Sequence, residues 1–495
     1  MPLLYEVVTP EWVKHAVFYQ IFPDRFAISS SLQKPHNLEP WDTTPTTYGY
    51  KGGDLLGVLE RLDYIQGLGV TAVYFNPIFQ SASNHRYHTH DYYQVDPLLG
   101  GNAAFDTLLA ECKRRGLRVV LDGVFNHASR GFFQFNDILE NGAASPWLDW
   151  FYVDDAGGVH PINAYDLQRA PGYKAWWGLH ALPKLNTDNP QVREYLMQVG
   201  EHWIRKGIDG WRLDVANEIT TPGFWQEFRQ RIKALNPDAY IVAEIWEESP
   251  QWLQGDQFDA VMNYPLTEAL ISFVAGKRLR REFVENKGYR PVAGITGQQF
   301  AAKVDRLLQL YPWPIVLAQL NLLDSHDTAR FISIADGDET SLRLATLLLF
   351  TLPGAPSIYY GDEIGMTGGG SDALARKTFP WNQPEAWNHE LRDFHKQVIA
   401  LRKTHPALRV GTFQNLYADT FGFAFARTLA DQTFVIAVNV GHESATQRLP
   451  LTRLINTDTA PRVVFGAASR VQTDNSTITL DLPARSATVL NVSQR

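Results

Sequence analysis

The stretch GWRLDVA at residues 210–216 joins a short apolar run to charged residues at its carboxyl end. Seven further runs share its length and its content of Val, Ile, Phe and Tyr: VFYQIFP (17–23), TAVYFNPIF (71–79), RVVLDGVFN (118–126), YIVAEIW (240–246), AVMNYP (260–265), LNLLDSH (320–326) and APSIYYGDE (355–363). Nearly continuous apolar runs of this length are typical of strands that are covered on both faces.

Helix-like amphipathic stretches separate these runs, for example residues 55–69 and 224–237. Eight alternating β and α units predict an α/β fold of the (β/α)8 TIM-barrel type. A doubly wound open sheet is the alternative. It is less favoured because polar residues cluster at the carboxyl ends of many runs and not at one switch point.

Two segments depart from the β/α alternation. Residues 128–185 are rich in Gly, Pro, Trp and Asn and are too long for a simple connection, so we expect an inserted domain B over the barrel mouth after strand three. Beyond residue 407, stretches such as TFGFAFART and QTFVIAVNV alternate in polarity and predict a C-terminal antiparallel β-sandwich. The predicted division is therefore a barrel of residues 1–127 and 186–407, domain B of 128–185, and a C-terminal domain of 408–495.

Composition restricts the partners and the compartment. The net charge is −8 with no basic block, which argues against nucleic acid or an anionic membrane as partner. The longest apolar stretch, residues 344–352, is too short to cross a bilayer, and the first residues lack the features of a signal peptide. Cys112 is the only cysteine, so no intramolecular disulfide can form. We therefore predict a cytoplasmic protein.

Carboxyl groups stand at the ends of three of the runs. Hydrolysis of a glycosidic bond with retention needs one carboxylate that attacks and one protonated carboxyl that donates. Asp214 shares a strand face with Arg212, whose guanidinium is expected to keep it ionised. Glu244 lies between two apolar residues, where a carboxyl group tends to hold its proton, and Asp327 follows the seventh run. Each acid alone also fits a helix cap or a core ion pair.

The order of the motifs strengthens the catalytic interpretation. The chain resembles the α-amylase family of glycoside hydrolases, family 13, across essentially its whole length. The family's sequence blocks occur in order: DGVFNH (122–127), GWRLDVANE (210–218), EIW (244–246) and NLLDSHD (321–327). The block LPKLN (182–186) is similar to the MPKLN form of the neopullulanase and cyclomaltodextrinase group, and SNHRY (83–87) points the same way.

The resemblance implies a role for each matching residue. Asp214 would be the nucleophile, Glu244 the acid/base, Asp327 the acid that stabilises the transition state, and Arg212 the partner of the nucleophile. Trp246 would line the acceptor side, and Asp122 and Asn126 would hold the strand-three loop together. The sugar before the scissile bond would be surrounded by His85, Tyr87, His127 and His326. The next glucose outward would be bound by Asp372 and Arg376.

Three departures from the family pattern carry expectations of their own. The first barrel strand starts by Val17, so the extra β-domain that commonly precedes the barrel is expected to be absent. After FPDRF (22–26) the chain continues with serines where calcium ligands would stand, and only Gly52, Gly53 and Asp54 of the later ligands remain. No metal site and no cofactor are therefore expected, and calcium is not expected to be required. His88 stands where relatives commonly have Asp.

The sequence predicts a retaining α-glucan hydrolase that cleaves α-1,4 and also α-1,6 bonds of maltodextrins, cyclomaltodextrins, pullulan or branched oligosaccharides. An α-glucan transferase on the same fold is the alternative, because it would use the same covalent intermediate. A non-catalytic glucan-binding protein is a third option, against which the three intact acids argue. The expected partner is an α-glucan oligosaccharide or polysaccharide, and a homodimer is a further option.

Overall fold

A computed structural model describes residues 7–153, 172–285, 287–450, 461–474 and 477–492. Its centre is a sheet of eight parallel strands in the order β8-β7-β6-β5-β2-β1-β10-β9. A parallel bridge between Met262 and Leu320 joins the two edge strands, so the sheet closes into a barrel. The strands are β1 (Phe18–Ile21), β2 (Ala72–Phe75), β5 (Arg118–Gly123), β6 (Gly210–Leu213), β7 (Tyr240–Ala243), β8 (Ala260–Val261), β9 (Leu320–Asn321) and β10 (Ala355–Tyr359).

Each of the eight predicted runs contains one barrel strand, so the predicted (β/α)8 barrel is confirmed and the open sheet is wrong. The side chains of these strands are almost entirely buried, which explains why the runs are apolar throughout. A hairpin of β3 (Phe79–Ser81) and β4 (Thr89–Val95) follows β2.

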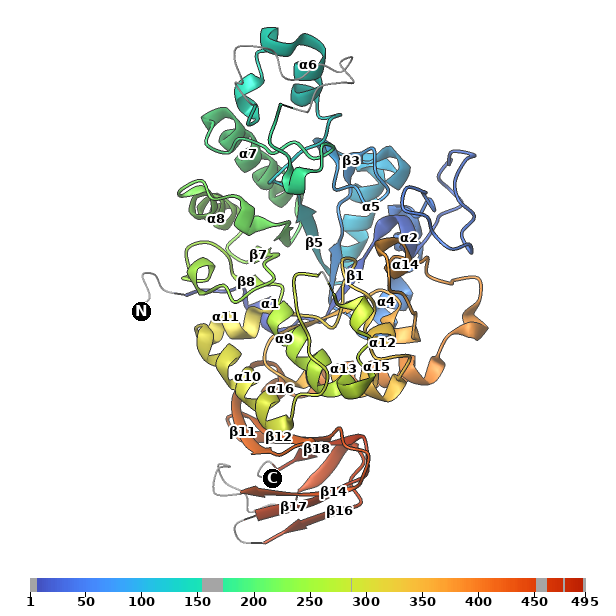
Figure 1. Cartoon of the computed structure of the whole chain (residues 1–495), viewed down its shortest axis with the longest axis vertical. Coiled ribbons are helices and arrows are strands. Elements are labelled where there is room, and N and C mark those ends of the chain that lie inside the picture. Colours follow the sequence, from blue (N-terminus) through green and yellow to red (C-terminus); the bar gives the residue numbers. More distant parts are fainter. Residues whose placement is uncertain (1–6, 154–171, 286, 451–460, 475–476, 493–495) are drawn as a thin grey trace.

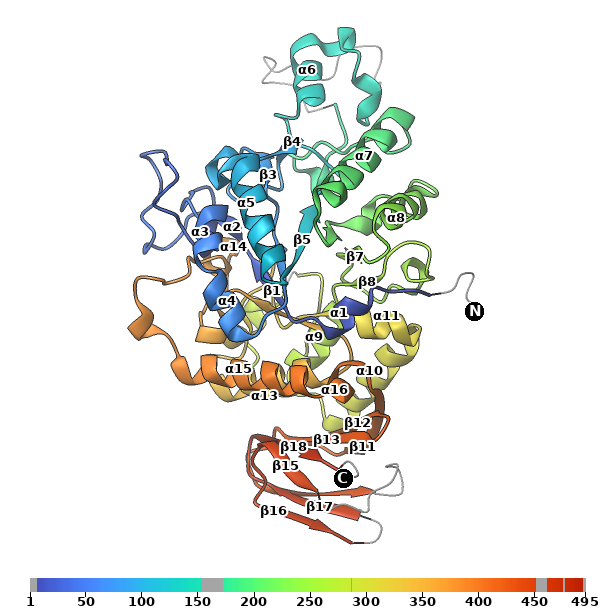
Figure 2. The same ribbon diagram turned by 180° about the vertical axis from the view of Figure 1, so that it is seen from behind.

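Helices surround the barrel (Figures 1 and 2). The amphipathic stretch 55–69 forms two helices and not one, because Arg61 leaves helical geometry with φ −106° and ψ 7°. None of the described helices is long and apolar enough to cross a bilayer. The helices of the barrel and its loops are α1 (Glu11–His15), α2 (Pro23–Phe26), α3 (Leu55–Glu60), α4 (Leu62–Leu68), α5 (Gly101–Arg114), α7 (Pro190–Lys206), α8 (Phe224–Leu235), α9 (Tyr264–Leu270), α10 (Gly297–Leu310), α11 (Trp313–Ala318), α12 (Phe331–Ile334), α13 (Glu339–Thr351), α14 (Asp372–Ala375), α15 (His389–Thr404) and α16 (Pro406–Val410).

The insertion between β5 and α7 stands at one end of the molecule and carries α6 (Phe133–Asn141) (Figure 1). Residues 154–171 of the predicted domain B lie outside the described residues. The returning part of the insertion pairs with the chain that leaves β5, through a bridge between His127 and Lys184, and with an earlier part of the insertion, through a bridge between Phe151 and Leu185. The insertion is therefore anchored at the carboxyl end of the barrel.

The C-terminal region lies at the opposite end of the molecule from α6 (Figures 1 and 2). It forms a five-stranded and a three-stranded antiparallel sheet around a shared apolar core, which confirms the predicted β-sandwich. Its strands are β11 (Thr412–Ala418), β12 (Gly422–Leu429), β13 (Gln432–Asn439), β14 (Ala445–Pro450), β15 (Arg462–Gly466), β16 (Arg470–Thr473), β17 (Thr477–Leu482) and β18 (Ser486–Asn491).

Candidate active site

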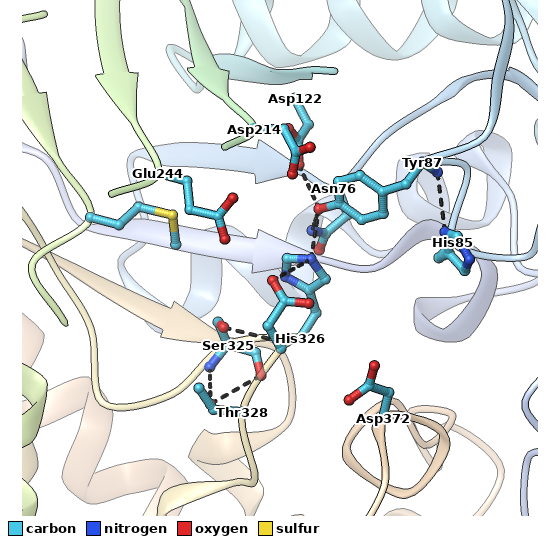
Figure 3. A network of polar contacts seen from close by, with 12 residues as sticks. Asn76, His85, Tyr87, Asp122, Asp214, Glu244, Ser325, His326, Thr328 and Asp372 are labelled. Atoms are coloured by element: carbon cyan, nitrogen blue, oxygen red, sulfur yellow. Dashed lines mark hydrogen bonds and ion pairs between the residues drawn. The ribbon is translucent and has the colours of Figure 1, made fainter. Parts of the chain in front are cut away.

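Asp214 and Glu244 follow directly after the neighbouring strands β6 and β7. Leu213 pairs with Ala243 in parallel register, so the next residue of each strand lies at the same level of the barrel. Both carboxyl groups project toward the same space at the carboxyl end of the strands, where His326 also points (Figure 3). This end of a TIM barrel is where catalytic residues gather.

Arg212 is fully buried and binds three acids at once. Its Nη1 lies 2.9 Å from Asp214 Oδ1 and 2.9 Å from Asp122 Oδ1, and its Nη2 lies 3.0 Å from Glu244 Oε1. The predicted partner of the nucleophile therefore also contacts the predicted acid/base. Asp122, expected only to hold a loop together, lies in the middle of this cluster.

The backbone after Asp214 adopts an uncommon conformation. Val215 has φ 38° and ψ 46°, in the left-handed region that β-branched residues avoid. Such a residue costs on the order of 1–3 kcal/mol and persists only where the surroundings hold it. Here the conformation directs the Val215 N–H to Glu244 Oε2 at 3.0 Å. The strained residue thus links the two candidate catalytic strands.

Trp246 also contacts Glu244, and its indole Nε1 donates to Glu244 Oε1 at 3.1 Å. One face of the indole stacks on Tyr264, with centroids 3.7 Å apart. The chain at Gly288 lies against the indole so closely that a Cβ there would come within 2.7 Å of the ring. Tyr264 and Gly288 lie against the ring, so Trp246 faces the site with its N–H edge. Its hydrogen bond to Glu244 orients that side chain.

Asp327, after β9, belongs to a second set of charges. Arg376 Nη2 lies 3.1 Å from Asp327 Oδ1 and 3.3 Å from Asp372 Oδ2, and Arg376 Nε donates to the His326 carbonyl at 2.7 Å. His326 Nε2 lies 3.0 Å from Asp327 Oδ2. Asp372 stands on α14, apart from Asp214 and Glu244 (Figure 3). Asp327 is therefore connected to the acid cluster through His326, whereas Asp372 lies at the edge of the candidate active site.

A chain of hydrogen bonds connects the two sets. Gln20 Nε2 donates to His326 Nδ1 and to Asn76 Oδ1, each at 3.0 Å. His326 therefore carries its proton on Nε2, which lies 2.6 Å from the Tyr87 hydroxyl, and that hydroxyl donates to Asp122 at 2.8 Å. The Tyr87 and His326 rings stack at 5.4 Å.

Gln20 and Asn76 were not predicted from the sequence. Both are buried polar residues at the carboxyl ends of β1 and β2. A polar residue near the end of an otherwise apolar run is the signal that could have found them.

His85 and His127 complete the set of predicted sugar contacts. His85 Nδ1 accepts from the Tyr87 backbone N–H at 3.2 Å, and its ring lies 4.9 Å from that of His88. His127 is 1% exposed and stacks against Trp176 of the insertion at 5.5 Å. Lys184 of the LPKLN block holds this region together, since its Nζ donates to Asn126 Oδ1 at 2.8 Å and to the Glu218 carbonyl at 2.7 Å.

Burial raises the pKa of several carboxyl groups in the cluster. It raises the pKa of Asp327 to about 7, with Glu244 as the next cause, and the pKa of Asp122 to about 6, against the opposing effect of Arg212. The pKa of Asp214 is raised by burial and by Glu244, and Arg212 offsets only part of the rise. Arg212 therefore favours the ionised form of Asp214, while burial and Glu244 favour the protonated form.

The histidines of the site are neutral. Burial lowers the pKa of His127 to about 3, and burial followed by the nearby Arg376 lowers the pKa of His85 and His326 well below their usual range. Neutral imidazoles offer one donor and one acceptor each, which suits the binding of sugar hydroxyl groups.

The family implies a calcium site near Asp54, and the residues there do not fit one. Lys34 Nζ lies 2.8 Å from Asp54 Oδ2 and donates to the Leu98 carbonyl at 2.9 Å. The Asp54 oxygens also accept from the backbone N–H groups of Ser29 at 2.9 Å and Gly57 at 2.7 Å. An ammonium group therefore takes the place where a hard cation would need oxygen ligands.

The closed barrel, with paired acids at its carboxyl end and a third acid joined by neutral imidazoles, defines the class of barrel glycoside hydrolases. Comparison with known proteins gives the family. Residues 20–398 match the α-amylase catalytic domain and residues 411–490 the α-amylase C-terminal domain. The chain belongs to the α-amylase family and is a hydrolase of α-glucans.

Three relatives illustrate the likeness. A debranching enzyme from Nostoc punctiforme is 52% identical with a TM-score of 0.90, over 98% of this chain and 100% of that one. A cyclomaltodextrinase of Geobacillus thermopakistaniensis is 43% identical over 448 residues, which are 89% of this chain and 71% of the relative. Neopullulanase 2 of Thermoactinomyces vulgaris is 43% identical over 442 residues, 88% of this chain and 71% of the relative.

Proposed function

We propose that the protein is a retaining hydrolase in which Asp214 attacks the anomeric carbon while Glu244 protonates the leaving oxygen. The resulting glycosyl ester on Asp214 would be hydrolysed by a water that Glu244 deprotonates, so that two inversions restore the α configuration. The observation that carries this proposal is Arg212, which holds Asp214 and Glu244 on neighbouring strands within 3.0 Å of one guanidinium.

The other residues would bind and orient the sugar. Asp327 and His326 would bind hydroxyl groups of the sugar before the scissile bond, together with His85 and His127, and the Tyr87 ring would stack on that sugar. Trp246 would line the acceptor side through its N–H edge and its contact with Glu244. Asp372 and Arg376, which form an ion pair of 3.3 Å, would bind the next glucose outward from the scissile bond.

For the substrate, we propose cleavage of both α-1,4 and α-1,6 bonds in maltodextrins, cyclomaltodextrins, pullulan or branched oligosaccharides. The support is that relatives 43–52% identical to this chain are named cyclomaltodextrinase, neopullulanase and debranching enzyme. These relatives carry different names, so the ratio of the two activities has to be measured.

The test is a substrate panel combined with proton NMR of the first-formed sugar. The α-anomer is expected from β-cyclodextrin, pullulan and branched maltodextrin. A β-anomer would refute the covalent mechanism, while products longer than the substrate would show transfer. Inert branched substrates would refute α-1,6 cleavage and leave the acid assignments standing.

We propose further that the protein acts in the cytoplasm, as the single cysteine suits a reducing compartment. Cell fractionation tests the location. A homodimer stays a prediction that light scattering on the purified protein would decide.

A further inference from the structure

The turn formed by Trp176–Gly178 in the insertion carries an unusual tryptophan. Trp177 is 80% exposed, whereas the other thirteen of the 14 tryptophans, all in described residues, are buried or half-buried. Its backbone has φ 50° and ψ 24°, in the left-handed region that large side chains rarely adopt. Both the exposure and the backbone conformation oppose folding stability, and strained residues of this kind cluster at ligand-binding sites.

The turn is firmly held, so the exposure of Trp177 is built in. The Trp176 N–H donates to the Leu182 carbonyl at 3.0 Å, and the Leu182 N–H donates to the Leu179 carbonyl at 2.8 Å. A bridge between Ala175 and Pro183 closes the base of the turn. Leu179, 49% exposed, adds apolar surface on the same turn.

A column of stacked rings joins Trp177 to the active site. Trp177 stacks on Trp176 with centroids 4.6 Å apart and planes 12° apart, and Trp176 stacks on His127 at 5.5 Å and 23°. His127 follows β5 at the barrel mouth and is one of the candidate sugar-binding residues. The exposed ring is therefore the outer end of a path that begins at the candidate catalytic centre.

One buried N–H group along this column lacks an acceptor. Trp176 Nε1 has no hydrogen-bond partner in the part of the chain that the structure describes. Buried donors without partners are rare, and oxygen-rich ligands such as sugars would supply the missing acceptor.

We propose that Trp177 is an outer binding platform for α-glucan chains, on which a glucose unit distant from the scissile bond stacks. One ring face is covered by Trp176, and the other is free to receive the apolar C–H face of a glucose ring. The proposal rests on the proposed function and adds a preference to it. The proposal predicts that long or branched glucans, which can contact the acids and the platform at once, gain more from Trp177 than maltotriose does.

The experiment compares kcat/KM on long-chain branched maltodextrin with kcat/KM on maltotriose. In Trp177→Ala and Trp177→Gly the ratio should fall about tenfold, chiefly through KM on the long substrate, and Trp177→Tyr should restore most of it because a ring face remains. Glycine fits the left-handed backbone without strain, so a loss in Trp177→Gly cannot come from a distorted turn. The matched control is Phe133→Ala, which removes another aromatic residue of the insertion that is 66% exposed.

A binding measurement separates this proposal from the proposed function. In an Asp214→Asn background, calorimetry with maltoheptaose should show about tenfold weaker binding when Trp177 is replaced by Gly. The platform would be overturned if replacing Trp177 changed neither the kcat/KM ratio of the two substrates nor the affinity for maltoheptaose. It would also be overturned if Phe133→Ala lowered the kcat/KM ratio equally. If the protein with native Asp214 cleaves no α-glucan, the proposed function fails, and the maltoheptaose titration still decides the platform.

Discussion

Arg212 and Arg427 are both fully buried, yet their surroundings differ in kind. Arg212, at the mouth of the barrel, faces the carboxyl groups of Asp122, Asp214 and Glu244. Arg427 of β12, at the junction with the C-terminal sheets, donates to backbone carbonyls, among them Thr351 at 2.6 Å and Gly411 at 3.0 Å.

The difference shows what each arginine does. Carbonyl oxygens carry no proton, so Arg427 can only satisfy the last carbonyls of α13 and the chain around α16, which tie the barrel to the sandwich. Arg402 does the same with the carbonyls of Phe350 and Gly354, and burial, followed by Arg409, lowers its pKa to about 9. Carboxyl groups exchange protons, so the cluster around Arg212 can perform acid–base chemistry.

The largest expected effect comes from removing one carboxylate of the Arg212 cluster. Asp214→Asn keeps the shape of the side chain but cannot attack carbon, so kcat should fall by roughly 10³-fold or more. Circular dichroism should stay unchanged. Hydrolysis within tenfold of the unaltered protein would refute Asp214 as the nucleophile.

At the carbonyl-bound site the effect should be on stability instead. Arg427→Met leaves several buried carbonyls without a donor and should lower the free energy of unfolding by about 3 kcal/mol. Urea denaturation measures the loss, and kcat of the folded fraction should be retained. Arg470→Met, on the exposed strand β16, is the control and should cost under about 0.5 kcal/mol. A loss below about 1 kcal/mol for Arg427→Met would show that the carbonyls find other partners.

The two regions also differ in how far sequence reasoning could reach. Each barrel strand was visible as an apolar run because its residues are buried on both faces. Asp214 and Glu244 were visible because they end such runs. The three-way contact of Arg212 was not predictable, since it depends on the register of β5, β6 and β7 and not on spacing along the chain. The contacts of Arg427 with backbone carbonyls were not predictable either, because every residue has a carbonyl group and no side chain marks the ones that are bound.

The contacts of Trp246 could not be predicted from spacing along the chain either. The residues that lie against its indole, Tyr264 and Gly288, are distant in sequence. Its bond to Glu244 gives the third prediction. Trp246→Phe keeps an aromatic ring but removes the donor, and kcat should fall about tenfold with little change in KM, as expected for the loss of one hydrogen bond. Trp252→Phe, whose ring packs on Phe258, is the control. If KM rises and kcat is unchanged, Trp246 binds sugar and does not orient Glu244.

A smaller effect should follow from the proton that the acid cluster holds. The pKa of Asp327 is raised to about 7, mainly by burial. The stability that this group contributes is therefore full below its unfolded value of about 4 and is lost as pH rises through 7. Asp327→Asn removes the titration, so its free energy of unfolding relative to the unaltered protein should rise between pH 5 and pH 7 and then stay level up to pH 9. Asp106→Asn, which breaks an exposed ion pair with Lys206, should show no such trend. A flat difference for Asp327→Asn would contradict the raised pKa.

The smallest effect is expected from calcium, and it extends the comparison to Lys34, a partly buried cation bound by both a carboxylate and a carbonyl. Lys34 binds Asp54 and the Leu98 carbonyl, so an ammonium group holds the loop after α2 to α3 with both a carboxylate and a carbonyl. A divalent ion would have to displace this ammonium and compete with the N–H groups that Asp54 already binds. We therefore predict that activity in EDTA stays within about twofold of that in millimolar Ca²⁺ and that the melting temperature is the same in both, since a ligand that does not bind the folded state cannot stabilise it. Lys34→Met, which frees Asp54 of its partner, should lower the melting temperature in either condition. Loss of most activity in EDTA with recovery on adding Ca²⁺ would show that the protein holds a required ion and that Lys34 does not replace it.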